Sequence, residues 1–114
     1  MYDNSLTEKR IFSRASVECE LSVSPVNLPK LPATVINISA SGIYCVSSRS
    51  IGELSRVNII LRINGGEDIP ARSVVIREEE LSDGSYGIGL FFTRITERGR
   101  DIIIEYTSDI ESTG

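Results

Sequence analysis

Apolar and polar residues alternate with a period of two in several short stretches of this chain. In the stretch Ala15–Ser24, serines and glutamates occupy one face, and the other face is apolar, with Val17, Cys19, Leu21 and Val23. Because successive side chains of a β-strand point to opposite faces, this alternation predicts an antiparallel strand with one buried face. Residues 57–63 alternate in the same way and predict a second such strand.

Four further stretches are rich in β-branched and aromatic residues, which favour strands. They are Ala33–Ile36, Ile43–Val46, Ile69–Arg77 and Tyr86–Phe92. The sequence Asn64-Gly65-Gly66 lies between two of the predicted strands and is a strong signal for a hairpin turn. The pattern therefore predicts about six or seven short strands joined by tight connections.

Proline and acidic residues mark other connections. Pro25 is expected to end the first strand, and Pro29 and Pro32 are expected to keep the chain irregular as far as Ala33. The run Glu78–Glu80, followed by Ser82-Asp83-Gly84, is expected to form an acidic turn. Three consecutive carboxylates do not converge on one ion, so this run does not indicate a metal site.

The pattern changes to a helical period near the end of the chain. One stripe of residues recurs there at spacings of three and four and is apolar except for a glycine, namely Ile95, Gly99, Ile102, Ile103, Tyr106 and Ile110. Thr96 is suited to cap the helix, and Glu97 is suited to the positive end of the helix dipole. Short antiparallel strands followed by one helix predict an all-β-dominated fold, a small β-barrel of six to seven strands with a C-terminal α-helix.

The length of 114 residues fits a single domain. We expect a flexible leader over residues 1–8, one domain over residues 9–110 and a tail over residues 111–114. The chain has no apolar run long enough to cross a membrane and no apolar segment of a secretory signal, which predicts a cytoplasmic protein. Cys19 and Cys45 are expected to be buried thiols, with a disulfide or metal site as the weaker alternative.

The net charge of −4 is unevenly distributed. Residues 1–62 carry a net charge of +2, and residues 63–114 carry −6. An acidic domain is a poor general binder of DNA or RNA, because their binding depends on many phosphate contacts. A small ligand with one or two phosphates needs only a local positive cluster, and Lys9, Arg10 and Arg14 supply one. Taken alone, this cluster has a second interpretation as a solvated basic surface.

The segment Asn37-Ile38-Ser39-Ala40-Ser41-Gly42 interrupts two apolar runs and is expected to be a tight loop between strands. Such a loop exposes asparagine and serine side chains, and its backbone N–H groups can form a concavity that binds an anion. Gly42 is expected to adopt a positive φ or to let a ligand approach the backbone closely. We interpret the loop as one half of an anionic-ligand site and Arg10 with Arg14 as the other half.

Two motifs carry a resemblance to a known family. Arg10–Arg14 fits the pattern R-x-x-x-R, and Asn37–Gly42 fits the pattern D/N-x-S-x-x-G. In this order, on a predicted barrel, they resemble the PilZ domain, a bacterial receptor for the second messenger cyclic di-GMP. The stretch Tyr86–Phe92 is similar to the closing strand of that family. The resemblance implies a split-barrel fold over nearly the whole chain.

The resemblance also implies roles for individual residues. Arg10 and Arg14 would bind the guanine edge and the phosphates of cyclic di-GMP, to which an arginine fork is suited. Asn37 and Ser39 would donate or accept hydrogen bonds from the opposite side, and Gly42 would allow the turn.

Lys9 and Ser41 are additional candidates for the site. Lys9 precedes the first arginine, and by resemblance a basic residue there favours a stacked pair of ligands over one. Asn37 is neutral where many relatives carry aspartate, which removes an acceptor charge for a guanine N–H group and avoids repulsion of the phosphates.

The predicted function is a receptor or adaptor, without a cofactor, that orders its N-terminal arm on ligand binding and signals to an unidentified partner protein. The first alternative is a PilZ-like interaction module that does not bind nucleotide. The second is a small barrel that binds single-stranded nucleic acid, which the low aromatic content of 6% disfavours. An enzyme is disfavoured because the chain has no histidine and its serines lack a partner base.

Overall fold

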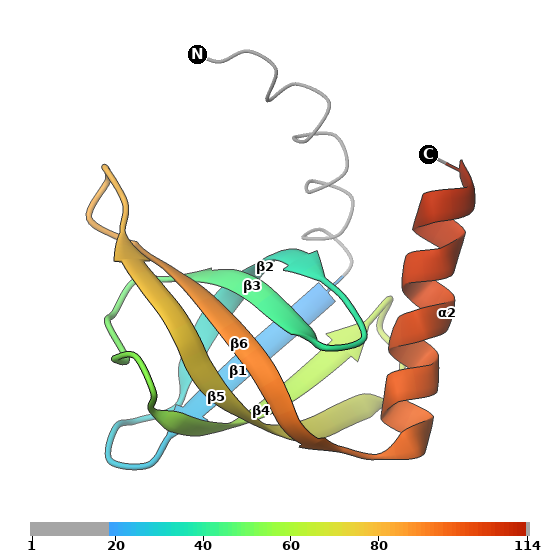
Figure 1. Ribbon diagram of the computed structural model, residues 1–114, viewed down its shortest axis with the longest axis horizontal. Coiled ribbons are helices and arrows are strands. Elements are labelled where there is room, and N and C mark those ends of the chain that lie inside the picture. Colours follow the sequence, from blue (N-terminus) through green and yellow to red (C-terminus); the bar gives the residue numbers. More distant parts are fainter. Residues whose placement is uncertain (1–18, 114) are drawn as a thin grey trace.

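The computed structural model describes the backbone of residues 19–113 and the side chains of residues 19–108 (Figure 1). This range contains six strands and one helix: β1 (Cys19–Pro25), β2 (Leu31–Ile38), β3 (Gly42–Ser47), β4 (Arg56–Ile63), β5 (Asp68–Glu80), β6 (Tyr86–Ile95) and α2 (Glu97–Thr113). The predicted order of strands followed by a terminal helix is confirmed. Residues 15–18 of the first predicted strand lie outside the described residues.

The strands form a closed antiparallel barrel in the order β1-β2-β3-β6-β5-β4. The barrel closes where β1 pairs with β4, from Cys19 opposite Ile63 to Pro25 opposite Val57. Closure leaves no unpaired strand edge in the barrel, so the backbone N–H and C=O groups of each strand face a neighbour on both sides. The prediction of a barrel with a C-terminal helix is therefore confirmed.

The alternating apolar residues fill the interior of the barrel. Val35, Leu61, Val75 and Ile88 are fully buried, with 0% of their surface exposed. Residues of β4 alternate strictly between exposed and buried, as a half-buried strand requires. The predicted and observed buried faces agree because side chains alternate with a period of two, so only one orientation of a strand puts all its apolar side chains inside the barrel.

Both cysteines belong to this core, and no disulfide joins them. Burial raises the pKa of the Cys45 thiol to about 12, because the charged thiolate is unfavourable away from water. Cys45 therefore behaves as a small apolar side chain, as expected.

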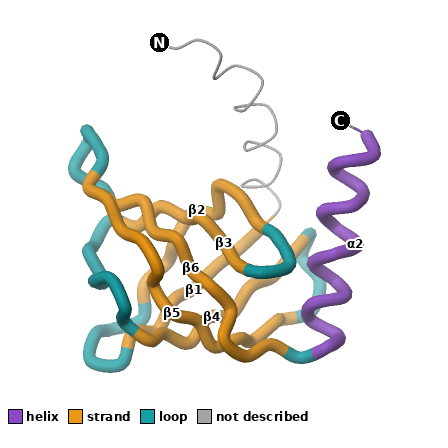
Figure 2. Tube along the Cα trace, in the orientation of Figure 1, coloured by secondary structure: helices purple, strands orange, loops and turns teal. Residues whose placement is uncertain are grey.

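One end of the barrel carries the start of β1, the β2–β3 loop, the β4–β5 hairpin and the start of α2 (Figure 2). The hairpin turn has positive φ at Asn64 (55°) and Gly65 (68°), and the Gly66 N–H donates to the carbonyl oxygen of Ile63 at 2.9 Å. Positive φ at both central positions matches the twist of a two-strand hairpin. The predicted hairpin is confirmed.

Helix α2 begins with the predicted cap, because the Thr96 hydroxyl accepts a hydrogen bond from the Gly99 N–H at 3.0 Å. Ile103 and Tyr106 lie in the core, with 0% and 8% of their surface exposed, so the apolar stripe of the helix packs against the barrel. The helix continues to Thr113 and thereby includes residues 111–113, which the sequence pattern placed in a tail. No helix in the described part of the chain is long and apolar enough to cross a membrane.

The expectation for Pro32 is wrong. Strand β2 begins at Leu31, so Pro32 lies within the strand and pairs with Ser22 of β1. The pairing of β2 with β3 begins only at Thr34. Pro32 therefore removes no ladder hydrogen bond between β2 and β3, and the strand tolerates it.

The expected acidic turn at Glu78–Glu80 is also wrong, because these residues form the last part of β5. The Glu78 carboxylate accepts hydrogen bonds from the N–H groups of Ile51 and Gly52, both at 2.9 Å, and from the Ser50 hydroxyl. Burial raises the pKa of Glu78, but these hydrogen bonds outweigh burial and the pKa lies below its usual value. Glu78 thus holds the β3–β4 loop against β5. Among the described residues, no three carboxylates or thiols form a metal-binding group.

Candidate ligand-binding site

The loop between β2 and β3 is shorter than the sequence pattern suggests. Asn37 belongs to the end of β2 and Gly42 to the start of β3, which leaves only Ser39-Ala40-Ser41 as the loop. The Ser39 N–H donates to the carbonyl oxygen of Gly42 at 2.9 Å, and the Gly42 N–H donates back at 3.4 Å. These two bonds close a tight turn that supports the exposed serines.

Gly42 is required for a different reason from the one expected. Positive φ occurs in the described residues at three other glycines and not at Gly42. A Cβ atom at Gly42 would instead overlap the backbone carbonyl oxygen of Leu90 and would lie 3.3 Å from the Cα of Phe91. The absence of a side chain therefore allows β3 to approach β6 closely at the base of the loop.

The loop is also anchored to β6. The Phe92 N–H donates to the carbonyl oxygen of Ser41 at 2.9 Å. Within the loop, the hydroxyls of Ser39 and Ser41 lie 3.1 Å apart, and the Ser41 N–H donates to the Ser39 hydroxyl at 3.3 Å. These contacts fix the two hydroxyl groups side by side before any ligand is bound, which lowers the entropic cost of binding.

Asn37 is exposed at the start of this loop and has a defined orientation. Its side-chain oxygen accepts a hydrogen bond from the Ile38 N–H at 2.9 Å. The side-chain amide nitrogen makes no hydrogen bond with the rest of the described chain. The two N–H groups of this amide are therefore available to a ligand acceptor such as a phosphate or carbonyl oxygen.

A groove of about 230 Å³ brings most of the predicted site residues together. Its lining includes Asn37, Ser39, Ser41 and Gly42 together with residues from β3, β5 and β6, namely Ile43, Tyr44, Ile76, Gly89, Leu90 and Phe91. The structure thus places four of the candidate residues in one concave surface. Lys9, Arg10 and Arg14 lie outside the described residues, so their proposed part in the site stays a prediction.

The groove contains two exposed apolar side chains that the sequence analysis missed. Ile76 is 57% exposed and Phe91 is 45% exposed, and both line the groove beside the serines. Phe91 stands between Leu90 and Phe92, whose side chains point into the barrel, so strand alternation alone directs Phe91 outward. Such apolar surface beside hydrogen-bonding groups suits an aromatic ring that also carries polar atoms.

Tyr44 forms a wall of the groove and is held in place by two neighbours. Its hydroxyl donates to a carboxylate oxygen of Glu79 at 2.9 Å, and its ring crosses over Gly87, where any Cβ atom would collide with it. Burial and the hydrogen bond to Glu79 both raise the pKa of the Tyr44 hydroxyl. Gly87 therefore leaves room for the Tyr44 ring to pack against β6.

Strand topology places the start of β1 at the same end of the barrel as the loop. The two strands are antiparallel, with Val23 opposite Leu31 and Leu21 opposite Ala33. The first described residue, Cys19, thus lies toward the end of β2 that leads into Ser39. Arg14 precedes Cys19 by five positions, and five residues of chain span at most about 18 Å.

Comparison with known proteins supports the architecture. The protein-family model of the PilZ domain matches residues 7–109. Among solved structures, one match is the Bacillus subtilis inhibitor of motility (MotI/DgrA), with a TM-score of 0.73 and 17% sequence identity. The match covers 86% of this chain and 49% of that protein, so this chain spans about half the length of that relative. At this identity the likeness shows the fold alone. No curated protein matches the chain.

The matching family model covers all six strands of the barrel and most of α2, together with both motifs, so the chain belongs to the PilZ domain family.

Proposed function

We propose that this PilZ domain is a receptor for cyclic di-GMP that binds the ligand between its N-terminal arginines and the Ser39–Ser41 loop. The observation that carries the proposal is that β1 begins at the same end of the barrel as the Ser39–Ser41 loop. The strand that follows Arg10 and Arg14 begins at the barrel end where Asn37, Ser39 and Ser41 are exposed.

The chemistry of the groove fits this ligand. Cyclic di-GMP carries two phosphodiester groups and two guanine bases, so it needs cations, hydrogen-bond donors and a flat apolar surface. The Asn37 amide and the two serine hydroxyls supply donors, and Ile76 and Phe91 supply apolar contact for a base. Among the residues that the structure describes, the lining of the groove includes no lysine or arginine, so the phosphates require positive charge from another part of the chain. Arg10 and Arg14 meet that need.

The proposed mechanism is ordering of the N-terminal arm over a preformed loop. The hydrogen bonds of Ser39, Ser41 and Phe92 hold the loop in one conformation, so the arm makes the larger adjustment. Charge-assisted hydrogen bonds of about 1.5–3 kcal/mol each offset the entropy lost by the arm. The rearranged surface is then recognised by a partner protein in the cytoplasm. The proposal assigns no reaction and no cofactor to the chain.

The test is calorimetric titration of the protein with cyclic di-GMP, with GTP and cyclic GMP as ligand controls. We expect saturable binding of cyclic di-GMP and much weaker binding of the controls. Arg10→Ala is expected to weaken binding by about 2–4 kcal/mol, roughly 30- to 1000-fold. Ser39→Ala is expected to weaken binding by about 1 kcal/mol, because it removes one neutral hydrogen-bonding group.

Arg49→Ala is the matched control, because it removes the same charge from the opposite end of the barrel. Arg49 is exposed and follows β3, whose first residue lies beside the loop and whose last residue, Ser47, lies at the far end. This variant is expected to bind like the parent. Parental affinity in Arg10→Ala would remove Arg10 from the site, and absence of any binding would favour an interaction module without nucleotide.

A further inference from the structure

The outer face of β4, β5 and β6 carries a group of arginines that do not line the proposed nucleotide groove. Arg72 of β5 and Arg94 of β6 are paired directly opposite each other, and Asn58 of β4 is opposite Arg72 on the other side. Arg56 lies two residues before Asn58 along β4. All four side chains are exposed, and we call Arg56, Asn58, Arg72 and Arg94 the basic face.

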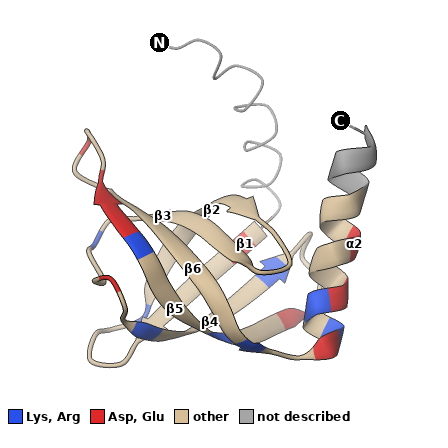
Figure 3. Ribbon diagram, in the orientation of Figure 1, with Lys and Arg blue, Asp and Glu red and all other residues tan. Residues whose placement is uncertain are grey.

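No carboxylate in the described part of the chain forms an ion pair with the basic face. Arg62, Arg77 and Arg98 each form an ion pair with a glutamate or aspartate, whereas Arg56, Arg72 and Arg94 form none with any described side chain. Figure 3 shows the acidic end of β5 in red, away from the blue segments lower on β4 and β5.

Two like charges directly opposite each other across a sheet destabilise it. Arg72 and Arg94 form such a pair in a chain whose net charge is −4 and whose carboxylates outnumber its cations. A carboxylate at either position would give a favourable pair instead. The observed arrangement thus costs stability and creates a local positive potential on an acidic protein.

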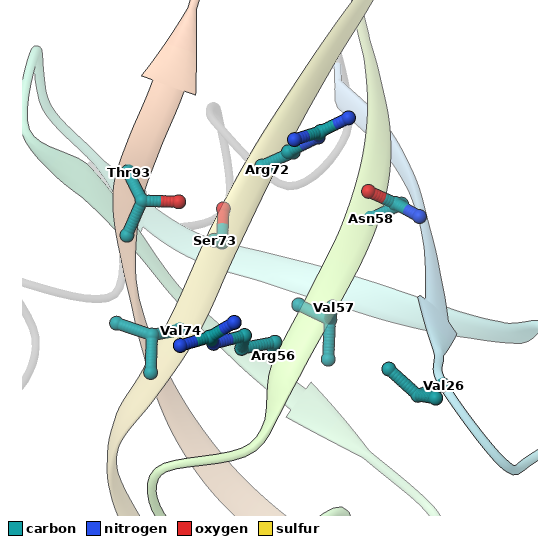
Figure 4. Close-up of a pocket in the computed structure, with 8 residues that line it drawn as sticks. All are labelled: Val26, Arg56, Val57, Asn58, Arg72, Ser73, Val74 and Thr93. Atoms are coloured by element: carbon teal, nitrogen blue, oxygen red, sulfur yellow. The ribbon is translucent and has the colours of Figure 1, made fainter.

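A groove lies within the basic face (Figure 4). It has a volume of about 450 Å³, and its lining includes Arg56, Asn58 and Arg72 from the basic face, together with Val26, Val57, Ser73, Val74 and Thr93. Thr93 is the extra residue of a bulge in β6, because Arg72 pairs with Arg94 and Ser73 pairs with Phe92. The bulge opens space beside the arginines and distinguishes this site from a flat sheet surface.

The groove also has an apolar component. Val26, in the β1–β2 loop, is 77% exposed, and Val74 is half-buried, opposite Arg56 of β4 and two residues after Arg72 along β5. A ligand that fills the groove would therefore place apolar atoms against the valines and anionic groups against the arginines. This combination differs from that of the proposed nucleotide groove, whose described lining has apolar side chains and hydroxyls but no cation.

We propose that the basic face binds an acidic segment of a partner protein, with carboxylates on the arginines and an apolar side chain against Val74. The spacing of the arginines along the strands favours a peptide over a single small anion as the ligand. Residues two apart on a strand are separated by about 6.8 Å, and an extended peptide repeats its side chains on one face at the same interval. Arg56 and Arg72 are offset by that interval along paired strands, because Asn58 is opposite Arg72. Three arginines on an acidic domain are too few for general nucleic-acid binding.

The test is an NMR titration of the ¹⁵N-labelled full chain, without nucleotide, at physiological salt. The probe is a short synthetic peptide of alternating glutamates and leucines. The control probes are the same peptide with glutamine in place of glutamate, and inorganic phosphate. We expect saturable shifts of the Arg56, Asn58, Arg72 and Arg94 amides with the acidic peptide only.

Two double variants distinguish a role of the arginines in peptide binding from a role in the stability of the barrel. Arg72→Gln with Arg94→Gln is expected to weaken peptide binding by about fivefold or more and to raise the melting temperature, because it removes the like-charge pair. The control variant, Arg49→Gln with Arg100→Gln, removes the same amount of charge outside the basic face. Neither of these arginines has an ion pair with a described side chain, and the variant is expected to bind the peptide like the parent.

The proposal is overturned if the acidic peptide gives no saturable shift, or if the first double variant binds it as the parent does. Equal shifts with inorganic phosphate would overturn it in favour of a small-anion site. A lower melting temperature of that variant would show that the arginines support the barrel. Because no nucleotide is present, none of these outcomes depends on the proposed receptor function.

Discussion

Replacement of Gly42 by alanine tests the physical role of the glycine that joins the loop to the barrel. The added Cβ atom would overlap the carbonyl oxygen of Leu90 and crowd the Cα of Phe91. Both obstacles are backbone atoms of the paired strand β6, so no side-chain rotation can relieve the overlap. Relief requires β3 to move away from β6 at the base of the Ser39–Ser41 loop.

The expected cost follows from this geometry. Overpacking a folded interior typically costs about 1–3 kcal/mol, and a rigid obstacle puts this site at the upper end, about 3 kcal/mol. For a domain of this size, each kcal/mol shifts the melting temperature by about 4–8 °C, so a decrease of roughly 12–24 °C is expected. The displaced loop is also expected to bind cyclic di-GMP more weakly than the parent does.

The assay is urea unfolding followed by circular dichroism, with Gly89→Ala as the matched control. Gly89 lies on β6 directly opposite Tyr44, and its added Cβ would meet the nearest side-chain atoms of Arg77 and Ile76 at ordinary distances of 3.6 and 3.7 Å. The control is expected to change the free energy of unfolding by less than about 1 kcal/mol. If Gly42→Ala is as stable as Gly89→Ala, the close approach of β3 to β6 is not what requires glycine.

Two further substitutions and one reactivity measurement test the core and the loops. Glu78→Ala is expected to lower the free energy of unfolding by about 2 kcal/mol at neutral pH, since it removes hydrogen bonds to a charged carboxylate. The pKa of Glu78 is depressed in the folded state, so this contribution is present above the ordinary carboxyl pKa and is lost as the pH falls through the folded value. Urea unfolding of parent and variant should therefore differ at pH 7 and converge in acid, and an equal difference at both would refute the assignment. Ser73→Ala is expected to raise the free energy of unfolding by about 1 kcal/mol, because the buried Ser73 hydroxyl has no hydrogen-bond partner among the described residues. Thermal unfolding of parent and variant measures the change, and a variant less stable than the parent would contradict the prediction. The Cys45 thiol, with its pKa raised to about 12, is expected to react with a thiol reagent only as fast as the barrel opens, whereas rapid reaction in the native protein would show that Cys45 is accessible.

Much of the barrel could be predicted from local sequence patterns. Residues 57–63 alternate strictly, and the structure buries the same face that the pattern indicates. The Asn64-Gly65 turn and the Thr96 cap are also local, because each depends on hydrogen bonds or φ angles within a few residues. Such features are specified by neighbours in the chain and need no knowledge of the fold.

The errors arose where distant parts of the chain decide the outcome. Glu78 lies in a strand because β5 pairs with β6 as far as Glu80, and the distant loop at Ile51 and Gly52 supplies N–H groups for its carboxylate. Gly42 is required because Leu90, 48 positions later by the numbering, lies against it. Sequence spacing carries no information about either contact.

Only part of the candidate site could be predicted from the sequence, because strand pairing brings the other residues to the groove. Asn37 and Ser39 belong to one continuous motif, so they could be identified together. Ile76 and Phe91 reach the groove only through the pairing of β5 with β6 and of β6 with β3. The pairing of Arg72 with Arg94 likewise depends on the bulge at Thr93, which shifts the register by one residue.

The most direct test of the central claim is calorimetric titration of cyclic di-GMP into the parent protein and into a variant with both Arg10→Ala and Arg14→Ala. The claim is that Arg10 and Arg14 bind the same ligand as Asn37 and the Ser39–Ser41 loop. We predict saturable binding to the parent and no detectable binding to the double variant, with the barrel unchanged by circular dichroism. Undiminished binding by the double variant would contradict the account.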